Sequence, residues 1–156
     1  MTTKLFISYS HQDESYKKEL ETHLASLRHR GIIEVWNDRR ISAGEEWKDE
    51  IDNNLKNSDL ILFLISSDFL ASDYCMDKEA LQAMKQHEEG TSTLIPIIIR
   101  QVRWQQEELN KFQALPKDAK AVSSSSWSSS DEAWCNVVEG IETVLETIKK
   151  RKPNYK

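Results

Sequence analysis

The sequence predicts an α/β fold with a central parallel five-stranded sheet and helices on both faces. Short apolar runs alternate with longer amphipathic stretches along the 156 residues, and this alternation is typical of strand–helix–strand units. The length suits one domain with a substantial core. Because right-handed crossovers place helices on both faces of such a sheet, we expect ligands at the carboxyl ends of the strands, where the loops share one rim.

Two short strands and the helix between them are expected first. Residues 4–8 and 32–36 are predicted as strands, and the helix that ends near Arg30 has apolar side chains at helical spacing, namely Tyr16, Leu20, Leu24 and Leu27. Gly31 follows this helix directly, as a residue that is free to adopt a positive φ at a helix end.

Three further strands complete the predicted sheet. Residues 59–65 are almost wholly apolar, which indicates a central strand covered on both faces. Residues 94–99 form the fourth expected strand, and Pro96 inside it predicts a bulge or a place near an edge, because proline has no N–H to donate. Residues 119–122 are a short candidate for the fifth strand.

Three more helices follow from composition or from an apolar stripe. One is predicted by Trp47, Ile51 and Leu55, which share a face. Residues 75–87 have a helical composition. The last helix has a single apolar stripe from Trp134 to Ile148, and the basic end of the chain complements the dipole of that helix.

Composition and charge exclude several classes of function. The chain has 21 Lys and Arg against 26 Asp and Glu, a net charge of −5, which argues against non-specific binding of nucleic acid. The longest apolar run, residues 60–65, is too short to cross a bilayer, and no signal peptide is visible. Cys75 and Cys135 form no CxxC pair. We therefore expect a cytoplasmic protein without membrane or nucleic-acid partners.

Familiar motifs for cofactors, metals and nucleophilic serines are absent from the sequence. It contains no P-loop, no GxGxxG after the first predicted strand and no GxSxG. The four histidines lie at spacings that no zinc site uses. We therefore expect neither a metal nor a resident cofactor.

Polar residues on the expected rim are the remaining candidates. Ser10, His11 and Asp13 open the first helix, where N–H groups favour an anion, although simple capping by Ser10 or Asp13 is the more ordinary role. Residues 38–40 suit a phosphate or a partner's carboxylate, or else a solvated loop. Glu79 lies one turn into the helix after the third strand. Its carboxylate suits a cationic transition state, or else belongs to an ordinary charged helix face.

The order of these motifs resembles a bacterial TIR (Toll/interleukin-1 receptor-like) domain. Each match is weak alone, but six in the right order are specific. The matching stretches are residues 6–10 (FISYS), 36–47 (WNDRRISAGEEW), 61–66 (ILFLIS), 68–75 (DFLASDYC, followed by Glu79), 95–98 (IPII) and 115–116 (LP). The resemblance covers residues 4–150 and implies a flavodoxin-like three-layer fold. We expect a TIR domain over residues 1–150 and a linker or tail over residues 151–156.

The resemblance also implies an activity. Some members of this family cleave NAD+ at the nicotinamide glycosidic bond, whereas others are adaptors without catalysis. The catalytic residue of the enzymes is a glutamate early in the helix after the third strand, and Glu79 occupies that place. Ser10 and His11 match positions of the first loop that approach the nucleotide. NAD+ is thus expected as a substrate and not as a bound cofactor.

Four further residues are weaker candidates for binding NAD+. Ser42 and Trp47 match the family's mobile loop and the helix that follows it, although Trp47 also fits the core. Arg39, in the same loop, suits a phosphate. Tyr74 stands where the enzymes of the family commonly have tryptophan, and a tyrosine ring can still stack on a base.

The expected partners are NAD+, other TIR domains through homo-oligomerisation, and a sensor domain or partner outside this chain. The product would be ADP-ribose or a cyclic isomer, in a bacterial immune or stress response. An alternative is a non-catalytic module that acts by self-association, for which mutation of Glu79 would be silent. A third reading, an unrelated flavodoxin-like binding domain, requires the six ordered matches to be accidental.

Overall fold

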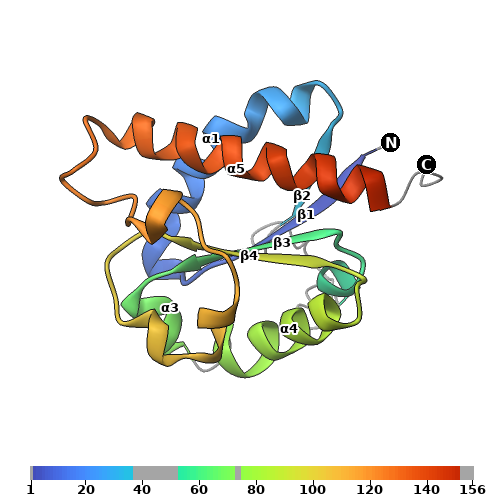
Figure 1. The fold of residues 1–156 in the computed structure, drawn as a ribbon, viewed down its shortest axis with the longest axis horizontal. Coiled ribbons are helices and arrows are strands. Elements are labelled where there is room, and N and C mark those ends of the chain that lie inside the picture. The colour runs from blue at the N-terminus through green and yellow to red at the C-terminus, as the bar shows by residue number, and fades with distance from the viewer. Residues whose placement is uncertain (1, 37–52, 73–74, 152–156) are drawn as a thin grey trace, which may run out of the picture.

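A parallel sheet lies between two layers of helices (Figure 1) in the computed structural model, which describes residues 2–36, 53–72 and 75–151. The strands are β1 (Thr3–Ser8), β2 (Ile33–Trp36), β3 (Leu60–Ile65) and β4 (Thr93–Ile98). The longer helices are α1 (Glu14–His29), α4 (Leu81–Glu88) and α5 (Ser130–Arg151), and the short α3 (Ser67–Ala71) follows β3. This is the flavodoxin-like three-layer arrangement that the sequence predicts.

The strands lie in the order β2-β1-β3-β4, and all their pairings are parallel. All six residues of β3 are 0% exposed, because strands flank it on both sides and helices cover both faces. The central strand expected from the apolar run is therefore confirmed. Pro96 lies in β4, an edge strand among the four described, as its missing N–H predicts.

The sheet separates two apolar cores. Alternate strand residues such as Leu5 and Leu62 pack with α1 and α5 on one face. Their neighbours Phe6 and Phe63 pack with α4 and the residues around α3 on the other face. Figure 1 shows the same division, with α1 and α5 above the sheet and α3 and α4 below it.

The expected fifth strand is wrong, because residues 119–122 do not form a strand. Asp118 and Ala119 have φ values of +61° and +56°, a left-handed backbone that no extended strand adopts. The chain instead touches the edge of β4 at two separate places. Leu115 donates its N–H to the carbonyl of Pro96 over 2.9 Å, and the N–H of Val122 reaches Ile98 over the same distance.

The ends of the described helices follow the sequence closely. Gly31, which follows the C-cap residue Arg30 of α1, has a φ of +72°, as expected of a residue that ends a helix. Residues 53–56 are helical and Leu55 is buried, whereas Trp47 and Ile51 of the same expected stripe lie outside the described residues. No helix within the described ranges is long and apolar enough to span a bilayer.

Candidate functional site

Glu79 is held at the carboxyl end of β1. Ser8, the last residue of that strand, donates a hydrogen bond from Oγ to Glu79 Oε1 over 2.7 Å. Both side chains are buried, with exposed fractions of 1% and 4%. A hydrogen bond inside the protein is electrostatically stronger than one in water, so this contact fixes the orientation of the carboxylate.

A π-helical turn, Cys75–Ala80, carries Glu79 and leads directly into α4. Two contacts to Ser72 hold its beginning: the Cys75 N–H reaches Ser72 Oγ over 3.1 Å, and the Met76 N–H reaches the Ser72 carbonyl over 3.0 Å. The thiol of Cys75 also lies 3.8 Å from the carbonyl of Tyr9. The turn is thus joined to the loop after β1. Single π-helical turns occur often at functional sites.

Ser10 and His11 lie in the loop after β1. Ser10 caps the short 3₁₀ helix His11–Asp13, because its hydroxyl accepts the N–H of Gln12 over 3.2 Å. The capping role expected for Ser10 is therefore present, and its contact with a ligand stays a prediction. His11 is exposed, with its ring centroid 6.0 Å from that of Tyr9. Arg39, Ser42, Trp47 and Tyr74 lie outside the described residues.

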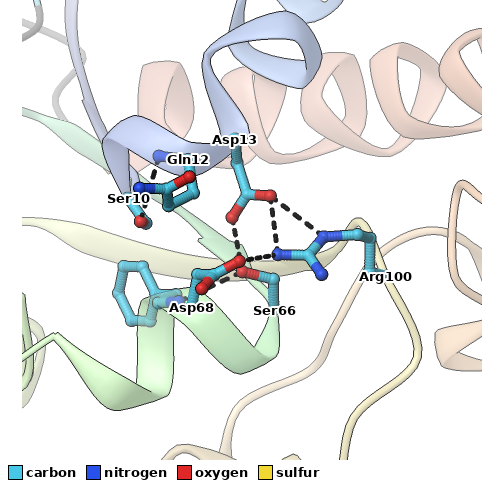
Figure 2. Close-up of polar contacts among 7 residues, drawn as sticks. Ser10, Gln12, Asp13, Ser66, Asp68 and Arg100 are labelled. Carbon is cyan, nitrogen blue, oxygen red and sulfur yellow. Dashed lines mark hydrogen bonds and ion pairs between the residues drawn. The ribbon is translucent and has the colours of Figure 1, made fainter.

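A second polar cluster on the same rim was missed by sequence reasoning (Figure 2). The guanidinium of Arg100 lies between Asp13 and Asp68. Its Nε and Nη2 contact Asp13 Oδ1 over 3.0 and 2.8 Å, and Nη2 contacts Asp68 Oδ2 over 2.6 Å. Ser66 donates its hydroxyl to the other oxygen of Asp13. Asp13 thus makes no capping bond to α1 and faces Arg100 instead.

Burial makes the Asp13 contact the dominant one in this cluster. The side chain of Asp13 is 1% exposed, against 32% for Arg100 and 44% for Asp68. Desolvation by burial lowers the pKa of Arg100, but the hydrogen bonds and charges of Asp68 and Asp13 outweigh it, so the net pKa lies above the ordinary arginine value. Arg100 therefore stays charged across the neutral pH range. The only signal in the sequence for a role of Arg100 was its position directly after the fourth predicted strand.

No group of three or more His, Cys, Asp and Glu among the described residues has the arrangement needed to hold a metal ion. The described polar groups of this rim include the carboxylates of Glu79 and Asp13 and the guanidinium of Arg100. A buried carboxylate beside the end of a parallel sheet is well placed to act on a polar ligand, because such ligands bind at this edge.

This fold is similar to that of solved TIR domains. The family model described as "TIR domain" matches residues 5–138, which is most of the chain. The protein therefore belongs to the TIR-domain family.

Individual relatives extend this finding. An uncharacterized protein of Sinorhizobium fredii, y4lF, is 42% identical over 137 residues, which are 88% of this chain and 42% of that protein. The chain thus spans less than half the length of this relative. The TIR domain of the Toll-related receptor TRR-2 from Hydra magnipapillata has a TM-score of 0.56 at 19% identity, over 88% of this chain and 97% of that domain. The TIR domains of the activated Roq1 resistosome give 0.50 at 18% identity, covering 61% and 56%. The two solved structures support the fold.

Proposed function

We propose that this domain cleaves the bond between nicotinamide and ribose in NAD+, with Glu79 as the catalytic carboxylate. The observation that carries the proposal is the buried hydrogen bond from Ser8 to Glu79 at the carboxyl end of the sheet. It supports the proposal because an oriented carboxylate at that edge is what the reaction needs.

One carboxylate is sufficient for this chemistry. Ordinary glycoside hydrolysis uses a second carboxyl group to protonate the leaving oxygen. The nicotinamide ring carries a positive charge in NAD+ and leaves as a neutral molecule, so no general acid is required. Glu79 would bind the ribose hydroxyls and place negative charge near the developing oxocarbenium ion. After nicotinamide leaves, attack by water gives ADP-ribose, and attack by the adenine or a ribose hydroxyl of the same ADP-ribosyl group gives a cyclic isomer.

The contacts of NAD+ are proposed from the family resemblance. Ser10 and His11 would approach the nucleotide from the loop after β1, where His11 is exposed. Arg39, Ser42, Trp47 and Tyr74 would complete the site, with Arg39 on a phosphate and an aromatic ring on a base.

We further propose that the domain is the effector part of a longer bacterial immune or stress-response protein that acts in the cytoplasm. The support is that its S. fredii relative is more than twice the length of the matched region. A sensor domain would then control it, and its activity would depend on assembly with other TIR domains, whose loops would help to complete the site.

The alternative function is a non-catalytic module that acts by self-association. The burial of Glu79 supports this alternative, because a carboxylate that accepts a hydrogen bond from Ser8 also joins β1 to the turn before α4. The two readings differ in what Glu79 does to NAD+, and this can be measured.

The test is chromatography of the products formed by concentrated protein with NAD+. Glu79→Gln keeps an oxygen that accepts from Ser8 but removes the charge, so we expect the rate to fall by about 10²–10³-fold, from a barrier about 3–4 kcal/mol higher. Glu89→Gln is the matched control, because Glu89 is exposed and follows the end of α4. Ser8→Ala should lower the rate less, since it only loosens the carboxylate.

The outcomes separate the two functions. Nicotinamide release by wild type and Glu89→Gln, but not by Glu79→Gln, supports the enzyme. Equal release by Glu79→Gln contradicts the assigned role of Glu79. No release by any protein, with unchanged thermal unfolding, favours the non-catalytic module.

A further inference from the structure

A cavity of about 940 Å³ opens beside the carboxyl end of β4. Residues 101–105 form one wall and residues 119–125 contribute the other. Both segments lie at the end of the sheet where α3 begins (Figure 1). The volume falls within the range of about 300–1,000 Å³ that is usual for small-molecule sites. None of its described lining residues belongs to the site proposed for NAD+.

The lining of this cavity is basic in an acidic chain. Its described residues include two cations, Arg103 and Lys120, together with three serines and two glutamines, and none of them is acidic. The whole chain carries 26 Asp and Glu, so twelve residues of average composition would include about two. Neither cation forms an ion pair with a residue that the structure describes. Their charges therefore remain available to a ligand.

Both walls are fixed before any ligand arrives. The N–H groups of Val122 and Ser123 donate to the carbonyls of Ile98 and Ile99 over 2.9 and 3.0 Å, which joins the serine-rich wall to the end of β4. Trp104, which is 7% exposed, anchors the wall formed by residues 101–105 in the core. A fixed wall lowers the cost of ordering residues when a ligand binds.

The cations come from the two different walls. Arg103 precedes the 3₁₀ helix Trp104–Gln106, and Lys120 follows the 3₁₀ helix Lys117–Ala119. The ammonium of Lys120 lies 4.0 Å from the centroid of the Trp127 ring, which limits its freedom without neutralising it. Arginine binds phosphate oxygens in pairs, and lysine acts as a point charge.

We propose that this cavity binds a phosphorylated small molecule of nucleotide size. Arg103 and Lys120 hold the phosphate groups from opposite walls, and the serine hydroxyls donate to the remaining oxygens. Two cations on separate walls suit a ligand with more than one charged group, such as a diphosphate. The proposal does not depend on cleavage of NAD+, because Glu79 and Ser8 are not among the lining residues.

The test is titration of ¹⁵N-labelled protein with ADP, pyrophosphate and adenosine, followed by NMR. The indole N–H signals of Trp104 and Trp127 should shift and saturate with ADP. The signal of Trp134, which is buried and bonded to Glu19, should stay in place. Pyrophosphate shifting the same signals identifies the phosphates as the recognised group, and binding by ADP alone shows that the nucleoside is also required. Adenosine should not bind, and equal binding of adenosine and ADP would overturn the proposal.

Two double variants complete the experiment. Arg103→Gln/Lys120→Gln should weaken ADP binding by about tenfold or more, because it removes both charged contacts. Arg28→Gln/Lys117→Gln removes the same net charge from exposed residues outside the cavity lining and should bind as wild type does. Glu79→Gln should also retain binding, which separates this cavity from the proposed NAD+ site. Equal affinity of the first variant and wild type, or no saturable ADP binding to wild type, would overturn the proposal.

Discussion

Replacing Arg100 tests whether its contact with Asp13 stabilises the rim. Arg100→Met keeps most of the aliphatic stem and removes the guanidinium. Asp13 would then be a carboxylate that is 1% exposed and has lost two contacts at 3.0 and 2.8 Å. The matched variant is Asp68→Asn, which removes the other charge that faces Arg100.

The expected loss in the free energy of unfolding follows from the burial of the charged residues in this cluster. Leaving a fully buried charge without its partner costs about 3–5 kcal/mol. Arg100 is 32% exposed and Ser66 still donates to Asp13, so we expect Arg100→Met to lower the free energy of unfolding by about 2–3 kcal/mol. Asp68 is 44% exposed, so Asp68→Asn should cost less than about 1 kcal/mol.

Urea unfolding followed by tryptophan fluorescence and circular dichroism measures these differences. The m-value, which is the slope of the free energy of unfolding against urea concentration, should not change, because the same surface is exposed on unfolding. A double-mutant cycle with Asp13→Asn should give a coupling of about 1–2 kcal/mol. Added salt should weaken the Asp68 contribution more than the Asp13 contribution. If Asp13→Asn costs the same with and without Arg100, the reasoning is refuted.

Two further predictions concern assembly and the packing of α5. If the proposed NAD+ cleavage depends on self-association, the rate per molecule should rise with protein concentration, and a flat specific rate over a wide dilution series would argue against assembly. Gly140→Ala should destabilise the fold by about 1 kcal/mol, although alanine favours helices, because its Cβ would lie 2.5 Å from Leu115 Cδ2. Thermal unfolding in a Leu115→Ala background, where the clash is gone, should show no such loss, and stabilisation of the wild-type background would contradict this account.

The strands that the sequence predicted correctly are those whose burial is visible in the local pattern. β3 needs apolar residues on both faces and has six in a row, so the apolar run predicts a strand there, over residues 59–65 against the observed Leu60–Ile65. The prediction of a fifth strand was wrong because residues 119–122, like a true strand, form a short and partly apolar run. Ala119 gives no signal of a positive φ, and Asp118 gives only a weak one, because a positive φ is uncommon even for aspartate, which adopts it more often than most residues.

The candidate site likewise contains features that the local sequence indicates and others that only the fold reveals. Glu79 was proposed as a site residue from the order of motifs around it, and its role stays a prediction. Its hydrogen bond with Ser8 joins residues 71 positions apart, which no periodicity reveals. Asp13 was expected as a possible helix cap. Its side chain instead contacts Arg100, 87 positions away, so the local signal for capping was overridden by a contact that exists only in the folded sheet.

The strand order explains why this particular contact forms. β1 and β4 are not neighbours, because β3 lies between them, and adjacent strands are about 4.8 Å apart. A group at the end of β4 must therefore reach across the end of β3 to meet the loop after β1, and arginine is long enough to do so. Ser66, directly after β3, fills the position between them and bonds to Asp13. Once the strand order is known, an ion pair between Arg100 after β4 and Asp13 after β1 can be predicted, because only the end of β3 separates them.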